Sequence, residues 1–582
     1  MLRIARTQWV QLQMKNLADR NVLLPLWLGS AATVTMARFF QAADPGYDLG
    51  LQLQAAHNLL AGRGLTTFSE LGQNLSHPNV LVPLTWFSAG YSLAAAAFSS
   101  AGLGVGMTVK VLGAAATMLG WWGWARLAQS FIGEGVTRPL WKWAAIVIAV
   151  TAPLLFTQPW GGTDIFLWAV VPWVLEYTVR ASDWKTREAV RFDWLAGSLC
   201  AFACLMRYAS LFLVGYVMCV IVWQSRLRAR ELFYRSFAFG VGVLPAFMLQ
   251  GYLNYLRPNE SPVTPGGLFI AHANVFSRLE AGIPSLHNAN YLWAFWIPGK
   301  IAGPMFPVRG NSFPLLLALL LAAFALLLLA FETYLSAFKL TSRDSRLLAL
   351  GLFPTIPLFL WGCMTLSASN YLRDLRYFWP VIPLSVLVAY SIAFIGDVPH
   401  RHVTRRFLRQ VAALYMFGYV GMSLVYLFFL FMPGTIGNSQ RQKVMAGSFE
   451  HWPSMAVTYE YSAGRRFVLE QLKEDPRVLL VTSTPAVFHW DPAFDASRIH
   501  STSCGGSEPR YFEGPVRILI LTFDEGAPDE VWGYTWNGRF GVRSRAPCFD
   551  RLPGRRLVRR FPDEGMKLLE ASVAPGQRIS LN

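Results

Sequence analysis

The chain has 582 residues, of which 54% are hydrophobic, 14% aromatic and only 15% charged. This composition is more apolar than that of a soluble globular protein and favours a membrane protein. The formal net charge of +17 does not indicate a nucleic-acid-binding protein, because the basic residues fall in short clusters between apolar runs, a pattern typical of cytoplasmic loops.

Apolar runs of about 20 residues, long enough to cross a bilayer core of about 30 Å, recur along the chain. The run 193–223 begins and ends at basic clusters, so we expect it to form two short crossings that turn at Arg207-Tyr208. The other expected spans are 22–41, 106–125, 143–159, 165–179, 236–256, 313–332, 348–366, 377–396 and 411–432. These runs predict a polytopic α-helical membrane protein with about eleven transmembrane helices.

The first outer loop, residues 42–105, is the most informative stretch. Arg63 is its only basic residue, which places it on the extracytoplasmic face. A helix is expected at 49–61 because Gly62 and Gly64 would end it. The apolar stretch 81–100 is either an interfacial or re-entrant element or half of an additional hairpin.

Two further segments are expected outside the membrane. Residues 257–312 form a long outer loop with an aromatic patch at 291–300, and residues 433–582 follow the last span of a transmembrane domain, 1–432. A helical pattern near 462–473 and β-rich runs at 477–484 and 517–523 predict a small extracytoplasmic α/β domain. In an oxidising compartment, Cys504 and Cys548 of this domain could form a disulfide.

Acids and cations on the outer face are the candidate functional residues. Asp44, Asp48 and Asp164 lie closest in sequence to span ends, and a carboxylate can remove a proton from an acceptor hydroxyl as a general base. Guanidinium groups can grip a departing phosphate through paired hydrogen bonds. The candidate phosphate-binding residues are Arg207, Arg376, Arg63, His77 and Lys300. Together these groups suit transfer from a phosphate-activated lipid.

Several motifs occur in an order that resembles a known family. They are Asp48-x9-Asn58-Leu59-x2-Gly62-x-Gly64, His77-Pro78, Asp164 at the start of a span, LMRYASLFL around Arg207, and Arg376-Tyr377-x2-Pro380. This order is similar to that of the GT-C glycosyltransferases, in particular the protein O-mannosyltransferase and aminoarabinose-transferase branch. The resemblance covers about the first 400 residues, and the tail carries no motif of that family.

The resemblance implies an inverting glycosyltransferase that moves a hexosyl or pentosyl group from a polyprenyl-phosphate carrier to an acceptor hydroxyl on a glycan, lipid or protein. Its loop acid corresponds to Asp48 rather than Asp44. The resembled family commonly has an acidic or polar residue directly after this acid, whereas this chain has Leu49, so no essential metal is predicted. The expected location is the bacterial inner membrane, with the active site on the periplasmic side.

Other interpretations remain open at the level of sequence. Asp48 and Asp164 stand where aspartate often caps a helix, and Arg207 could extend to the lipid headgroups. A lipid-linked-sugar flippase or transporter would use the same basic outer face without a general base. A glycan polymerase or ligase would make the loop acid less central, and a noncatalytic scaffold would need none of these residues.

Overall fold

The computed structural model describes part of the chain. The described residues are 47–69, 73–84, 87–132, 163–183, 186–225, 228–255, 463–475, 477–482, 494–501, 510–523, 552–562 and 566–581, with the single residues 32 and 410. The predicted spans at 22–41, at 143–159 and beyond residue 312 lie outside them, as does the aromatic loop 257–312. The expected total of eleven helices therefore remains a prediction.

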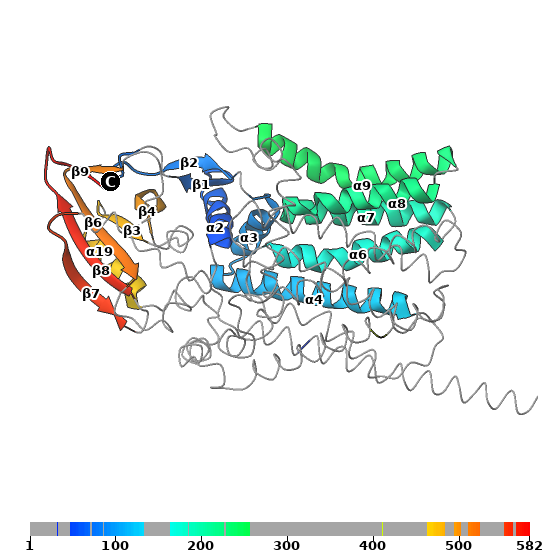
Figure 1. The fold of residues 1–582 in the computed structure, drawn as a ribbon, viewed down its shortest axis with the longest axis horizontal. Helices are drawn as coiled ribbons and strands as arrows, with labels where there is room; N and C mark the ends of the chain where they lie inside the picture. The colour runs from blue at the N-terminus through cyan, green and yellow to red at the C-terminus, as the bar shows by residue number, and fades with distance from the viewer. Residues whose placement is uncertain are drawn as a thin grey trace, which may run out of the picture.

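Long helices lie side by side in a bundle (Figure 1). They are α4 (Val105–Ile132), α6 (Asp164–Asp183), α7 (Thr186–Met206), α8 (Leu211–Ser225) and α9 (Ala229–Tyr255). The predicted break at Arg207-Tyr208 is confirmed, since a short 3-10 helix at Tyr208–Ser210 separates α7 from α8. Within the described ranges, two helices, at Arg187–Met206 and Ala229–Leu253, are long and apolar enough to cross a membrane by length and composition.

The contacts between helices give their relative directions. Gly120 of α4 lies against Trp168 of α6, and further along both helices Arg126 pairs with Glu176, so α4 and α6 run in the same direction. This is the relation expected for two inward spans separated by one outward span. It agrees with the path predicted from the basic clusters.

Helices α7 and α9 also run in the same direction, and they approach closely. Asp193 pairs with Arg235, and one turn later Gly197 meets Phe239. A Cβ at Gly197 would lie 2.3 Å from the backbone oxygen of Phe239, so only glycine lets the two backbones pack this tightly. Small residues serve this purpose at helix interfaces within membranes.

Charged residues meet at one end of the bundle. Arg235, 2% exposed, donates hydrogen bonds of 2.6 and 3.2 Å to the fully buried Asp193 carboxylate and one of 2.8 Å to Gln224. At the same end Glu176 accepts from Arg126 and lies 2.7 Å from Arg180. These arginines come from clusters predicted to be cytoplasmic, and each buried carboxylate has a cationic partner, as burial requires.

The free face of α9 is apolar. Eight large hydrophobic side chains of this helix are exposed, namely Phe233, Tyr234, Phe237, Val241, Leu244, Phe247, Met248 and Tyr252. Most follow one another at intervals of three or four residues, so they form a stripe along the helix. An exposed apolar stripe of this length is typical of contact with lipid.

The first outer loop folds at the other end of the bundle (Figure 1). It consists of α2 (Tyr47–Leu60), a hairpin of β1 (Thr66–Ser69) and β2 (Val80–Pro83), and α3 (Gly90–Ser100). Helix α3 has 11 residues, or about 16 Å, which is too short for a bilayer core of about 30 Å. The stretch 81–100 is therefore a strand and a short helix, and the alternative of an additional transmembrane hairpin is wrong.

The C-terminal residues form the expected small α/β fold. A mixed five-stranded sheet has the order β4-β3-β6-β8-β7, in which β3 (Leu479–Thr482) pairs in parallel with β4 (Ile499–Ser501) and β6 (Val516–Phe523). In the same sheet, β8 (Met566–Val573) is antiparallel to β6, and β7 (Arg556–Phe561) is antiparallel to β8. Strand β5 (Tyr511–Glu513) pairs separately with β9 (Arg578–Ser580). Helix α19 (Ala463–Glu474) precedes β3, close to its predicted place.

A cluster of charges ties three segments of this domain together. Glu570 on β8 accepts hydrogen bonds from Arg517 at 2.7 Å and from Arg556 at 2.7 and 2.9 Å, and Arg517 also reaches Gln471 of α19. Burial raises the pKa of the Glu570 carboxyl, but the hydrogen bonds and charges of the two arginines outweigh burial and hold that pKa below its usual value.

Candidate functional site

The end of the bundle that carries the first outer loop is the candidate site. Helix α6 begins there at Asp164, and α7 ends there at Met206, directly before Arg207. Helix α2, which lies across this end (Figure 1), has Asp48 as its second residue. Three predicted site residues from distant parts of the sequence therefore belong to elements that meet at one end of the molecule.

Close packing fixes α3 on this end. A Cβ on Gly90 would lie 2.5 Å from the backbone oxygen of Leu205, so glycine lets α3 touch the end of α7. Tyr208 donates a hydrogen bond of 3.2 Å to the carbonyl of Phe87 and accepts one of 2.9 Å from Gln250 of α9. The turn after Arg207, which follows α7, thus connects the first outer loop to α9.

The structure around α2 explains three residues of the sequence motif, namely Asn58, Gly62 and Gly64. Gly62 and Gly64 have φ of 75° and 73°, a conformation that favours glycine and ends the helix. The Asn58 amide, fully buried, donates a hydrogen bond of 2.9 Å to the carbonyl of Thr66 just beyond this turn. Four residues earlier, Gln54 accepts from the backbone N–H of Phe68. The motif therefore clamps strand β1 onto α2.

Asp48 and Leu49 stand at the start of α2. Asp48 is the second residue of α2 as described, and the capping interpretation stays a prediction. A carboxylate in the first turn is favoured by the helix dipole. Leu49 is 2% exposed and belongs to the apolar core. Leu49 therefore contributes to packing, at the position where the resembled family commonly has an acidic or polar residue.

The structure places the predicted cations differently from one another. Arg207 is half-buried at the break between helices; its backbone N–H donates to Ala203 and its carbonyl accepts from Ser210. Arg63 is exposed after the end of α2, with its guanidinium 5.9 Å from the ring centre of Phe68. His77 is exposed in the connection between β1 and β2.

Five predicted residues lie outside the described residues, so their roles remain predictions. They are Asp44, Lys300, Arg376, Cys504 and Cys548.

Lys110 is a candidate that the sequence reasoning missed. It lies near the beginning of α4 and is 2% exposed. In the described part of the chain, no hydrogen bond or ion pair joins its ammonium group to another residue. A lysine in a membrane-length apolar run is costly to bury and usually functional. The signal was available, because Lys110 is the one charged residue in the predicted span 106–125.

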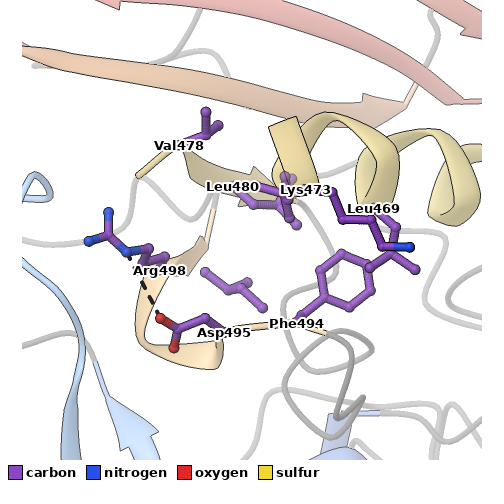
Figure 2. A pocket seen from close by; sticks show the side chains of 9 residues that line it. Leu469, Lys473, Val478, Leu480, Phe494, Asp495 and Arg498 are labelled. Atoms are coloured by element: carbon purple, nitrogen blue, oxygen red, sulfur yellow. Dashed lines mark ion pairs between the residues drawn. The ribbon is translucent and has the colours of Figure 1, made fainter. Parts of the chain in front are cut away.

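Two other features bear on the chemistry. Within the described ranges, no group of three His, Cys, Asp or Glu side chains could hold a metal ion. A cavity of about 200 Å³ lies in the C-terminal domain between α19, β3 and the segment 494–499 (Figure 2). Its lining is mainly apolar and contains none of the predicted site residues.

No family model and no curated protein matches the chain. Among solved structures, it is similar to ArnT from Cupriavidus metallidurans bound to undecaprenyl phosphate, at 14% identity and a TM-score of 0.44 over 95% of this chain and 99% of that one. The apo state of the same protein gives 13% identity and a TM-score of 0.43 over 95% and 98%. Because both TM-scores are low, we infer function from the residues of this chain.

Proposed function

We propose that the chain is an inverting glycosyltransferase that moves a sugar from a polyprenyl-phosphate carrier to an acceptor hydroxyl at the extracytoplasmic face of the membrane. One observation carries this proposal. The helices and turn that bear Asp48, Asp164 and Arg207 meet at one end of the bundle, beside the interfacial helices. A lipid-linked donor reaches an enzyme at this level of the membrane.

The groups suit a direct displacement. Asp48 takes the proton of the acceptor hydroxyl, whose oxygen attacks the anomeric carbon of the sugar. The new carbon–oxygen bond forms as the bond to the phosphate oxygen breaks, and the electron pair leaves with the prenyl phosphate. Attack from the face opposite the phosphate inverts the anomeric centre. In this mechanism Asp164 orients the sugar or the acceptor.

The leaving phosphate needs positive charge, because negative charge develops on it during transfer. Arg207 is the principal candidate, with Arg376, Arg63, His77 and Lys300 as the others proposed from sequence. We add Lys110, since this residue is 2% exposed and its ammonium has no counter-charge within the described residues. Binding of an anionic lipid phosphate would supply that counter-charge.

The sidedness of the site is supported by two sets of contacts. Asn74 of the first outer loop bonds to Glu513 of the C-terminal domain, which supports a location of the loop and this domain on one side of the membrane. Arg126 and Arg235, from the predicted cytoplasmic clusters, lie at the far end of the bundle. The extracytoplasmic face is therefore the side proposed for the chemistry.

Transfer by the purified protein in liposomes tests the proposal. A synthetic polyprenyl-phosphate sugar and a panel of hydroxyl acceptors supply the substrates. We expect Asp48→Asn to lower turnover by about 100-fold or more, while Asp44→Asn, a matched change four residues earlier, stays near wild type. Equal turnover for both variants would remove Asp48 as the base. Movement of the donor across the bilayer without transfer would instead establish a transporter.

Lys110 is tested in the same liposomes through binding of prenyl phosphate. Lys110→Met should weaken inhibition by prenyl phosphate at least tenfold, whereas Lys110→Arg should retain most of it, because the charge is kept. Unchanged inhibition by the Met variant, in protein of wild-type thermal stability, would show that Lys110 does not contact the phosphate.

A further inference from the structure

A short segment of the first outer loop is built into the C-terminal domain. Leu75 is 1% exposed, and its side chain belongs to the same apolar cluster as Val481, Phe512 and Ile518. The cluster is the core of the C-terminal sheet. A residue that follows α2 and β1 in the chain therefore completes the core of a domain formed by the other end of the sequence.

Backbone hydrogen bonds reinforce this burial. Leu75 donates to the carbonyl of Tyr511 and Tyr511 donates to the carbonyl of Gln73, each at 2.9 Å. The segment thus forms a parallel β-bridge between Asn74 and Tyr511 of β5, similar to the pairing by which peptides extend the edge of a sheet. The Ser76 hydroxyl also accepts a bond of 2.8 Å from the backbone N–H of Glu513. These contacts form the first anchor of the loop.

Asn79 forms a second anchor. It is 6% exposed, and its amide donates to the carbonyls of Ile499 at 2.6 Å and Ala496 at 3.3 Å. Its backbone N–H donates to the carbonyl of Ser497 at 2.6 Å. The receiving segment is itself held in shape, since Asp495 accepts from the backbone N–H of Ser497 and from its hydroxyl. Figure 2 shows this segment, with Asp495 paired to Arg498, beside the cavity.

The two anchors enclose His77 and Pro78, the exposed residues between them. Strand β2 begins directly after Asn79 and pairs with β1. Strand β1 is in turn held to α2 by the side chains of Asn58 and Gln54. A continuous set of hydrogen bonds therefore runs from the C-terminal domain through the hairpin to the helix that carries Asp48.

We propose that the C-terminal domain is a positioning element of the transferase and that Asn79 is the residue through which it acts. Held at both anchors, the loop keeps His77 in place and, through the hairpin, sets the position of α2. A two-stranded hairpin is marginally stable by itself, so the anchors supply order that the loop lacks alone. This inference rests on the proposed function, because it assigns a role in that reaction.

Turnover in liposomes by full-length variants provides the first test. We expect Asn79→Ala to lower kcat by about 10-fold to 100-fold, because small misplacements of catalytic groups have effects of this size. The KM for the sugar donor should change less than kcat. Asn74→Ala is the comparison variant. It removes the exposed bond to Glu513 and the bond that the Asn74 side chain accepts from the backbone N–H of Ser76, but it leaves the bonds of Asn79 intact, so its turnover should stay within about threefold of wild type.

A crosslink separates positioning from general loss of structure. Ser76→Cys and Glu513→Cys place two thiols where the side chain of one residue already meets the backbone of the other, so a disulfide should form in the full chain. When added to Asn79→Ala, this disulfide should restore turnover under oxidising conditions, and reduction should remove the gain.

The outcomes distinguish this inference from the proposed function. If wild-type protein transfers no sugar, the proposed function fails and the positioning role falls with it. If wild type is active and Asn79→Ala is equally active, the positioning role is refuted while the function stands. Failure of the oxidised crosslink to rescue a slow Asn79→Ala variant also refutes positioning through the anchors.

Discussion

The ion pair between Arg235 and Asp193 gives the sharpest prediction for the stability of the bundle. The Asp193 carboxylate is fully buried, and the 2%-exposed guanidinium binds it through two hydrogen bonds of 2.6 and 3.2 Å. Arg235→Met leaves that carboxylate in an apolar environment without its cation. Breaking a buried pair in this way costs about 3–5 kcal/mol. We therefore expect Arg235→Met to unfold at markedly lower denaturant concentration than wild type.

Arg228, the residue directly before α9, offers a matched control. Arg228 lies 3.2 Å from Glu231, but its side chain is 76% exposed. Because an exposed pair contributes only about 0–1 kcal/mol, Arg228→Met should be close to wild type. A double variant, Asp193→Leu with Arg235→Met, removes both charges and should recover most of the lost stability.

Unfolding by SDS in mixed micelles, followed by circular dichroism, measures these differences. The order of stability should be wild type, then Arg228→Met close below it, then the double variant, with Arg235→Met well below all three. If Arg235→Met and Arg228→Met lose equal stability, the buried pair is not what holds α7 to α9. If the double variant is the least stable, desolvation is not the dominant cost.

The remaining predictions concern the C-terminal domain and helix packing. The pKa of Glu570 is lower in the folded than in the unfolded state. The stability that Glu570 contributes is therefore complete above its unfolded pKa and is lost as pH falls through its folded pKa. Glu570→Gln should reduce the stability of the protein at neutral pH, and unfolding measured across pH should show a weaker loss of stability in acid. Gly197→Ala should lower the free energy of unfolding by about 1–3 kcal/mol, whereas Gly240→Ala, with nothing within 4 Å of its Cβ, should be neutral or stabilising, and equal effects would contradict the α7–α9 contact. Cys504 and Cys548 should shift the mobility of the native protein on reduction, and labelling of both as free thiols would exclude the disulfide.

Local pattern predicted the elements whose physical cause is local. The helix after Asp48 ends where Gly62 adopts a positive φ, as the glycine predicted. The break at Arg207 was expected because basic clusters lie at both ends of the apolar run. The strand near 517–523 was predicted because a run of buried β-branched and aliphatic residues is a strong local signal.

Other elements had no comparable signal. The hairpin strands β1 and β2 have four residues each, and the connection between them, residues 70–79, is much longer than the two-residue turn that marks a tight hairpin. Strand β7 is rich in arginine and its burial does not alternate, so its sequence resembles a loop. Its pairing with β8 depends on residues such as Glu570, which satisfy its charges only in the folded sheet.

Sequence alone determined the chemistry available to this protein and the side of the membrane on which it is proposed to act. Composition, apolar run length and charge clusters are read along the chain, and the motif around Asp48 and Asn58 needs no distant partner to be recognised. Only the tertiary structure decided that Leu75 and Asn79 belong to the C-terminal domain and that Lys110 is buried without a partner among the described residues. Burial and hydrogen bonding between segments more than 400 residues apart depend on how the chain folds back on itself, and no local pattern records that.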